Sequence, residues 1–331
     1  IEPLDDYFAS WDEADQFAES TLEAASIGGT LYGIPYNTNG RALAYRKDVL
    51  EDLGLDVPQT WTELIETART ITAETDMFGL FLCSDVSGPR GPQEFLSWYY
   101  QVSGGENMFT VSGAAGDQVS YDATVEELEI VLSLYDAAFA GNNPAVDPNE
   151  RGNGWESEDP GFVAGRWAMA PMGPWLWGRR GDSESARDVL ENRTALASLP
   201  VYEDGEPATY LEVKSIMMNV ASEHKDEAWE LMKFITSEDM MARWLVDSGG
   251  IPPRQDSLES DIMTEAEIGW WLEGFANEVP NAVGPAPMNW GPVNEANMRA
   301  VSDVIYDERS PADAAQWLHD QVSGLNEAGE L

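Results

Sequence analysis

The segment from Leu31 to Leu64, LYGIPYNTNGRALAYRKDVLEDLGLDVPQTWTEL, constrains the fold more than any other stretch of the chain. Its pattern predicts a strand, a turn, a second strand, a helix, a loop and a capped helix in close succession. Thr60 and Glu63 match a capping box, so we expect the last helix to begin there and to end near Thr75. Strands that alternate with helices are typical of an α/β protein.

Polar residues interrupt the otherwise core-like runs of this segment. They are Asn37, Thr38, Asn39 and Arg41. Buried polar groups are costly unless they are paired, and no residue close in the sequence is an obvious partner. We therefore expect a polar ligand or a neighbouring lobe to pair them.

The rest of the chain continues the alternation of helices and strands. The spacing of apolar residues predicts helices over 124–140, 222–235, 237–247 and 310–325. Short apolar runs predict strands over 79–83, 167–171, 195–199 and 216–220. No linker rich in Pro, Gly or Ser divides the chain, so a two-lobe arrangement requires the chain to cross between the lobes more than once.

The charge of the chain restricts its partners and its working conditions. Its 331 residues include 60 acidic and 18 basic ones, which gives a formal net charge of −42, and the acidic residues are spread along the whole chain. This argues against binding to nucleic acid or to anionic lipid, whose phosphates attract Lys and Arg. Charges of one sign repel in dilute salt and are screened in molar salt, where the Debye length is about 3 Å. We therefore expect a protein of a halophilic archaeon or bacterium.

The single cysteine, Cys83, excludes a disulfide within the chain. The chain starts abruptly at Ile1-Glu2-Pro3-Leu4, and this start lacks the basic and then apolar residues of a secretion signal. We expect that the true N-terminus, with any signal or lipid anchor, is missing from this sequence.

Several motifs follow one another in a specific order. They are Pro3 to Tyr7, Tyr32 to Tyr36, Tyr45 to Asp48, Pro58 to Leu64, Phe95 to Gly105, Phe162 to Met169, Gly173 to Trp175, Lys225 to Phe234 and Gly250 to Arg254. Each motif is modest alone, but their order and spacing together are specific. By these motifs the chain closely resembles, over nearly its whole length, the sugar-binding solute receptors of ABC importers, a family similar to maltose-binding protein.

The resemblance implies an α/β protein with a two-lobe, periplasmic-binding-protein-like fold. In that fold, strands cross between the lobes and the lobes close on the ligand. Mapped onto this chain, the crossings lie near residues 38–41, 210–215 and 249–254. One lobe, which would lack its start, comprises residues 1–38 and 213–250, and the other comprises 41–210 and 255–331.

The resemblance also implies ligand-binding residues near these crossings. Trp175 lies at the family's sugar-stacking position, directly after Gly173-Pro174, and Trp290 matches a second stacking position. A flat aromatic face covers the apolar C–H face of a sugar, whereas the competing interpretation of either Trp is core packing. Asn39 lies at a polar hinge position, and its amide can both donate hydrogen bonds to hydroxyls and accept them.

Six further candidates lie close to these positions. They are Tyr36, Asn37, Arg41, Glu94, Trp98 and Glu212. For Glu94, the alternative interpretation is a solvated carboxylate on the surface.

The candidate residues also indicate the class of ligand. The aromatic ones favour a disaccharide, an oligosaccharide or a related polyol. A sugar phosphate would instead be bound by basic residues such as Arg41 and Arg90.

Catalysis has little support in the sequence. The only histidines, His224 and His319, have no Ser or Cys motif nearby. Residues 147–158 mimic a Ca²⁺ loop, but Arg151 puts a cation where a ligand oxygen belongs. We therefore expect no enzyme and no cofactor.

The expected function is that of a monomeric, extracytoplasmic binding subunit, tethered through a lipid anchor, that delivers a sugar to an ABC permease. A glycoside hydrolase remains an alternative, because it needs only two carboxylates. A receptor for a non-sugar solute is the other alternative.

Overall fold

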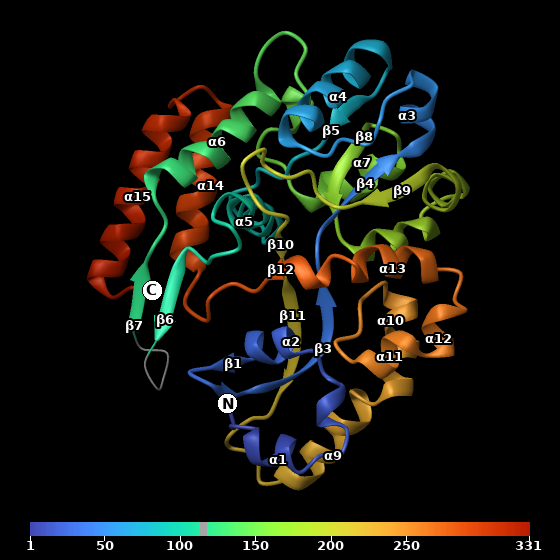
Figure 1. Ribbon diagram of the computed structural model, residues 1–331, viewed down its shortest axis with the longest axis vertical. Helices are drawn as coiled ribbons and strands as arrows, with labels where there is room; N and C mark the ends of the chain where they lie inside the picture. The colour runs from blue at the N-terminus through green and yellow to red at the C-terminus, as the bar shows by residue number, and fades with distance from the viewer. Residues whose placement is uncertain (113–117) are drawn as a thin grey trace.

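Two long strands join the lower and upper lobes of this protein (Figure 1). The structure is a computed structural model, and it describes residues 1–112 and 118–331. The joining strands are β3 (Gly33–Asn39) and β11 (Glu212–Met217), which pair antiparallel. A bridge between Thr38 and Ile251 brings a third passage of the chain to the same place.

The upper lobe contains a four-stranded sheet that continues directly from β3. After Gly40 and Arg41 the chain enters β4, which lies between two antiparallel neighbours, β8 and β9, while β5 pairs parallel with β8 at the edge. In spatial order the strands are β5 (Phe78–Leu80), β8 (Trp167–Met172), β4 (Ala42–Arg46) and β9 (Thr194–Ala197). Gly40 and Arg41, which join β3 to β4, are therefore attached to the sheet of the upper lobe.

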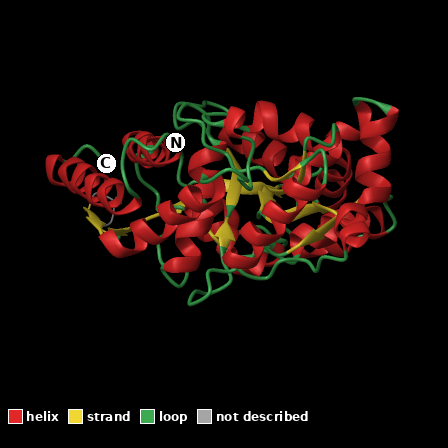
Figure 2. Cartoon of the chain, turned by 90° about the horizontal axis from the view of Figure 1, so that it is seen from above, coloured by secondary structure: helices red, strands yellow, loops and turns green. Residues whose placement is uncertain are grey.

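Helices surround these strands in the upper lobe, as the view from above also shows (Figure 2). They are α3 (Lys47–Leu53), α4 (Trp61–Glu74), α5 (Arg90–Val102), α6 (Val125–Phe139), α7 (Trp155–Val163), α8 (Glu184–Asp188), α13 (Gly269–Ala276), α14 (Gly291–Ile305) and α15 (Pro311–Ala328). Four short helical segments accompany them: η2 (Pro148–Glu150), η3 (Pro174–Gly181), η4 (Val189–Arg193) and η5 (Val279–Asn281).

The lower lobe and the region beside the crossing strands contain the remaining helices. They are α1 (Asp5–Ala9), η1 (Ala14–Gln16), α2 (Glu19–Ala24), α9 (Lys225–Ile235), α10 (Glu238–Ser248), α11 (Gln255–Glu259) and α12 (Asp261–Thr264). Three small two-stranded sheets complete the described chain: β1 (Ser26–Ile27) with β2 (Thr30–Leu31), β6 (Phe109–Ser112) with β7 (Gln118–Tyr121), and β10 (Thr209–Tyr210) with β12 (Ala282–Val283).

Three clusters of buried apolar side chains form the core. The largest fills the space among α4, α5, α6, α14 and α15, and a second packs α13 against β8 and η3. The third draws its buried members only from residues 4–34 and 218–245. No helix in the described part of the chain is both long and apolar enough to cross a membrane.

Most of the predicted elements are confirmed. The capping boxes at Thr60 and Thr124 begin α4 and α6, and Pro311 opens α15 at its first position. The strand predicted over 216–220 is shifted, because β11 begins at Glu212 and ends at Met217. Apolar runs were the basis of that prediction, whereas β11 is a polar, half-exposed strand whose extent is set by pairing with β3.

Candidate functional site

A cavity of about 550 Å³ lies where the two crossing strands meet the first turn of α5, η3 and the end of α10. Six of the nine residues predicted to bind ligand line it. They are Tyr36, Asn37, Asn39, Arg41, Trp175 and Glu212. Residues from segments far apart in the sequence meet here because β3 and β11 pair at this point.

Asn39 and Glu212 form the centre of the crossing. They lie opposite each other on β3 and β11, and Asn39 Nδ2 donates to Glu212 Oε2 at 3.0 Å. Burial alone would raise the pKa of Glu212, but the charge of Arg41 and the hydrogen bond from Asn39 outweigh it and lower that pKa. Glu212 is therefore ionised at neutral pH, and it is the one carboxylate among the described residues that line the cavity.

Trp175 is positioned by the two residues that precede it, Gly173 and Pro174. Pro174 O accepts a hydrogen bond from the indole of Trp271 at 2.9 Å, which anchors the start of η3. A Cβ at Gly173 would lie 1.8 Å from the Trp175 ring, so only glycine allows the ring to lie against the backbone there. This close approach is the physical reason for glycine in the Gly-Pro-Trp motif.

Two guanidinium groups lie over the Trp175 ring. Those of Arg41 and Arg90 are 4.5 Å and 4.2 Å from its centroid. Such cation–π contacts stabilise both partners. These two side chains of the protein therefore already cover part of the Trp175 ring. A sugar that stacks on this ring would have to share its surface with them.

Arg90 begins α5 and is paired with carboxylates on its inner side. Its Nη1 donates to Glu158 and lies 3.6 Å from Asp159. Burial would lower the pKa of Arg90, but the charge of Glu158 outweighs it and raises the pKa. Arg90 is therefore a neutralised cation at the cavity wall.

Three predicted ligand residues lie elsewhere. Trp290 donates from Nε1 to Ala286 O at 2.6 Å, packs edge-on against Phe109, and lies partly buried against the largest core cluster. Glu94 and Trp98 are buried on the inner face of α5, which leaves only Pro89, Arg90 and Gln93 of that region at the cavity. Core packing and helix orientation place these three residues away from the crossing-strand cavity, and their role in ligand binding stays a prediction.

The structure adds cavity residues that sequence reasoning missed. Trp155 begins α7 and Trp244 lies on α10, and these two side chains are 39% and 47% exposed. Trp244 packs against Tyr36 at 5.3 Å between ring centroids. No local pattern singles out Trp244, because it follows the buried Met241 by three residues, which is the spacing of an apolar helix face.

The segment that mimics a Ca²⁺ loop has other partners. Glu150 accepts a hydrogen bond from Arg166, Asp147 lies 3.6 Å from the same guanidinium, and Glu158 pairs with Arg90. Asp147, Glu150 and Glu158 are thus neutralised by arginines, which leaves them poorly suited to bind a cation.

One buried group of residues has the composition of a metal site. Ligand atoms of Cys83, Glu94 and Glu158 lie within 4.8 Å of one another. Burial raises the pKa of the Cys83 thiol, which keeps it protonated, and Arg90 already supplies a positive charge to Glu158. The donor set therefore fits a metal ion poorly.

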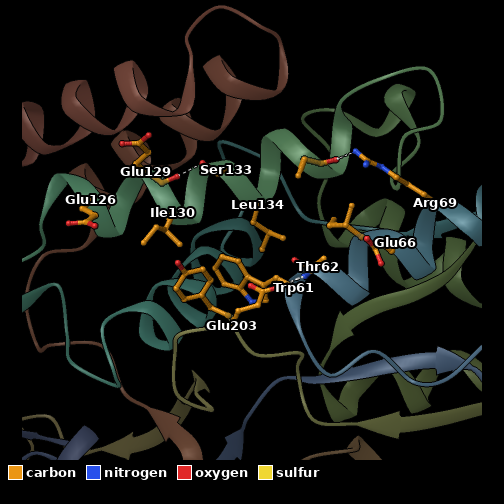
Figure 3. A pocket seen from close by; sticks show the side chains of 13 residues that line it. Trp61, Thr62, Glu66, Arg69, Glu126, Glu129, Ile130, Ser133, Leu134 and Glu203 are labelled. Carbon is orange, nitrogen blue, oxygen red and sulfur yellow. Dashed lines mark hydrogen bonds between the residues drawn. The ribbon is translucent and has the colours of Figure 1, made fainter.

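A second cavity lies on the outer side of the upper lobe, away from all nine predicted residues. This groove of about 610 Å³ runs between α4 and α6, with Trp61, Ile130 and Leu134 at its floor and carboxylates at its rim (Figure 3). Its polar groups do not converge on one point as those of the crossing-strand cavity do, so we assign the binding site to the crossing strands.

Comparisons with known proteins agree with this architecture. Residues 1–268 match the family model described as bacterial extracellular solute-binding protein. A Deinococcus radiodurans protein described as a probable ABC transporter-binding protein is 22% identical over 311 residues, which cover 92% of this chain and 71% of the relative. A maltotriose-binding protein of Pyrococcus abyssi is 22% identical over 315 residues, 93% of this chain and 62% of the relative.

The fold is also found among solved structures. The maltose-bound T. maritima MalE3 superposes with a TM-score of 0.80 at 22% identity, over 98% of this chain and 80% of the other. This likeness shows the two-lobe α/β fold. Because the family model matches most of the chain, this protein belongs to the bacterial extracellular solute-binding proteins.

Proposed function

We propose that this protein captures a saccharide in the cavity at the crossing strands and delivers it to the permease of an ABC importer. One observation carries the proposal: aromatic rings and convergent polar groups line the same cavity. Trp155, Trp175 and Trp244 offer apolar ring surface, while Asn39 and Glu212 offer acceptors and donors for hydroxyls. The names of the maltotriose-binding relative and of the maltose-bound structure support the same ligand class.

Closure of the two lobes would trap the ligand. We propose lobes of residues 1–38 with 213–250 and of 41–210 with 255–331, with crossings near 38–41, 210–215 and 249–254. The third core cluster, confined to residues 4–34 and 218–245, supports the first lobe as a separate packing unit. A permease that prefers the closed form would distinguish loaded from empty receptor.

A glycoside hydrolase is the competing function. Such enzymes use a pair of carboxylates on either side of the scissile bond. In the part of the chain that the structure describes, the cavity lining offers one carboxylate, Glu212, which is bonded to Asn39. This favours binding without chemistry.

A panel of neutral and charged mono-, di- and oligosaccharides, with peptides as a non-sugar arm, tests the proposal. Isothermal titration in molar KCl should detect binding of at least one saccharide, and chromatography of the same mixtures should show no new products. Turnover of a saccharide would establish the hydrolase instead. Binding confined to peptides would establish a non-sugar receptor.

The conditions and place of action are part of the proposal. The family description supports a location outside the cytoplasm, and we propose that a lipid tether keeps the receptor, as a monomer, near its permease. The net charge of −42 supports a haloarchaeal or other halophilic source, because molar salt screens such a surface.

A further inference from the structure

We propose that the saccharide taken by this cavity is anionic, and that Arg41 binds its carboxylate or phosphate. This inference rests on the proposed function and narrows its ligand class. It is carried by the burial, the contacts and the missing ion-pair partner of Arg41.

Arg41 is a buried cation held at the junction of β3 and β4. Its side chain is almost wholly inaccessible, with 1% of the residue surface exposed, yet it lines the cavity. The backbone N–H donates to Thr209 Oγ1 at 3.0 Å, and Nη2 donates to the side-chain oxygen of Gln93. These contacts and the Trp175 ring fix the guanidinium in place.

Two donor atoms of this guanidinium have no partner in the described chain. Nε and Nη1 of Arg41 are buried without a hydrogen bond. A buried donor that has left water and found no acceptor costs free energy, and for a charged group the cost is larger. An acceptor oxygen brought by a ligand would remove this cost.

The neighbouring cations already have carboxylate partners, and Arg41 does not. Arg90 pairs with Glu158, and Lys214 Nζ lies 3.7 Å from Glu212 Oε2. Among the described residues Arg41 forms no ion pair, and its nearest carboxylates act on it only at longer range. Arg41 is therefore the cation at the cavity that lacks a direct carboxylate contact among the described residues.

The charge of this cavity is the reverse of that of the whole chain. Three of the 18 basic residues, Arg41, Arg90 and Lys214, line it together with one acidic residue, Glu212, although acidic residues outnumber basic ones 60 to 18 in the sequence. Burial, and secondly the charge of Arg90, lower the pKa of Arg41 to about 10, which still leaves it protonated at neutral pH.

Two kinds of saccharide carry the required group. A uronate brings a planar carboxylate, and a sugar phosphate brings a tetrahedral oxyanion; guanidinium binds both through charge-assisted hydrogen bonds. In either case the exposed rings of Trp155 and Trp244 remain available for the apolar face of the sugar. The shared requirement is a saccharide with an anionic substituent.

Matched ligand pairs test the charge preference directly. We would titrate the full chain in 2 M KCl with a galacturonic acid dimer and the neutral galactose dimer of the same linkage, and with a maltose phosphate and maltose. Inorganic phosphate and acetate serve as anions without a sugar. We expect at least one anionic saccharide to bind tenfold or more tightly than its neutral partner, since a charge-assisted hydrogen bond in a buried site is strong.

Each result separates the inference from the function on which it rests. A preference for the uronate or for the phosphate supports the inference and identifies the anionic group. Equal or tighter binding of the neutral partner overturns the inference and leaves saccharide binding intact. Failure of all saccharides to bind, or equally tight binding of inorganic phosphate or acetate, overturns both.

Variants then locate the preference. Arg41→Gln should reduce affinity for the anionic saccharide by tenfold or more, with a much smaller effect on the neutral partner. Arg187→Gln removes an exposed charge on α8, outside the cavity lining, and should leave both affinities unchanged. If Arg41→Gln does not fold, Arg41→Lys is used instead, because it keeps the charge but not the fork of donors. The ratio of the affinities for the anionic and the neutral saccharide is then compared between Arg41→Lys and the wild type, and an unchanged ratio would mean that the fork of donors does not set the preference. An Arg41→Gln protein that keeps the full preference would overturn the assignment to Arg41.

Discussion

The indole of Trp175 lies within 4.5 Å of two guanidinium carbons, measured from the ring centroid, and at the wall of the cavity. Trp175→Ala removes both the ring surface for a sugar and the support of Arg41 and Arg90. We expect the Kd for the bound saccharide to rise about tenfold or more, because a lost aromatic contact is worth roughly 1 kcal/mol or above. Isothermal titration of the variant measures this.

Trp290 provides a matched control for that prediction. Trp290→Phe removes the hydrogen bond to Ala286 O and keeps an aromatic ring in the core. We expect a lower Tm and an unchanged Kd, since Trp290 lies outside the cavity lining. If Trp175→Ala binds normally while Trp290→Phe does not, the site is misplaced.

Glu94 and Glu158 make the stability of the upper lobe depend on pH. Burial, together with the charge of Glu158, raises the pKa of Glu94 well above its ordinary value, and burial raises the pKa of Glu158 to about 7. The folded state thus binds protons more tightly than the unfolded state. The contribution of these two protonated carboxyls to the free energy of unfolding is fully present below the pKa of about 4.3 that Glu has in the unfolded chain. It is lost as the pH rises through the higher pKa values of the folded state.

Replacement of one carboxyl should flatten this dependence. Glu94→Gln keeps the acceptor for the backbone N–H of Cys83 and removes one titrating group. Between pH 5 and pH 8 we expect the free energy of unfolding to fall less in the variant than in the wild type. Denaturant unfolding at both pH values measures it. Glu129→Gln, on the exposed face of α6, should follow the wild type; an identical pH response in Glu94→Gln would refute the prediction.

At the scale of elements, η3 positions the cavity wall through one glycine. A Cβ at Gly173 would overlap the Trp175 ring at 1.8 Å, whereas a Cβ at Gly178 in the same helix meets nothing within 4 Å. We expect Gly173→Ala to displace the ring and weaken saccharide binding about tenfold, in line with loss of the aromatic contact. Gly178→Ala should bind as the wild type does.

Titration and Trp fluorescence of the two glycine variants distinguish displacement of the ring from a general loss of fold. The expected result is a changed emission and a higher Kd for Gly173→Ala alone. Equal affinities of both variants would mean that the ring tolerates the extra methyl group by a shift of the backbone.

The paired strands β3 and β11 combine two functions that favour different residues. A strand between lobes must pair its backbone, and here it must also direct polar side chains into a cavity. Asn37, Asn39 and Glu212 meet the second requirement, and the ladder between the strands meets the first. This explains why polar residues interrupt β3 without breaking it.

For the whole molecule, charge repulsion is the dominant long-range term. A net charge of −42 should destabilise the compact state when salt is dilute. We expect the Tm to rise steeply between 0.1 M and 2 M KCl, with most of the gain complete near 1 M, where the Debye length is about 3 Å. Calorimetry over this KCl series measures the effect. A Tm that does not change with KCl would refute it.

Local signals predicted much of the fold. The capping box at Thr60 begins a helix as expected, and the helices predicted over 124–140 and 310–325 begin after Thr124 and Ser310, since such start signals involve neighbours in the chain. The extent of β11 could not be predicted in this way, because its pairing partner lies far away in the sequence. The two-lobe arrangement itself was implied by the resemblance rather than by composition.

The candidate site was predicted in part. Asn39, Arg41, Trp175 and Glu212 lie at the cavity because each is next to a crossing or a motif that the sequence displays. Trp290 matched a motif as well, yet it packs against the largest core cluster, outside the cavity lining. Trp155 and Trp244 were identified as cavity residues only from the tertiary structure, because their exposure depends on which neighbours pack around α7 and α10.

The sequence by itself determined the α/β class, the start of the main helices, the polar character of the crossing and the large negative charge. Each of these follows from residue type or from contacts between near neighbours. Only the tertiary structure decided that Arg90 and Lys214 have carboxylate partners while Arg41 has none. Pairing of charges depends on distances between segments that are remote in the chain, and no local pattern encodes those distances.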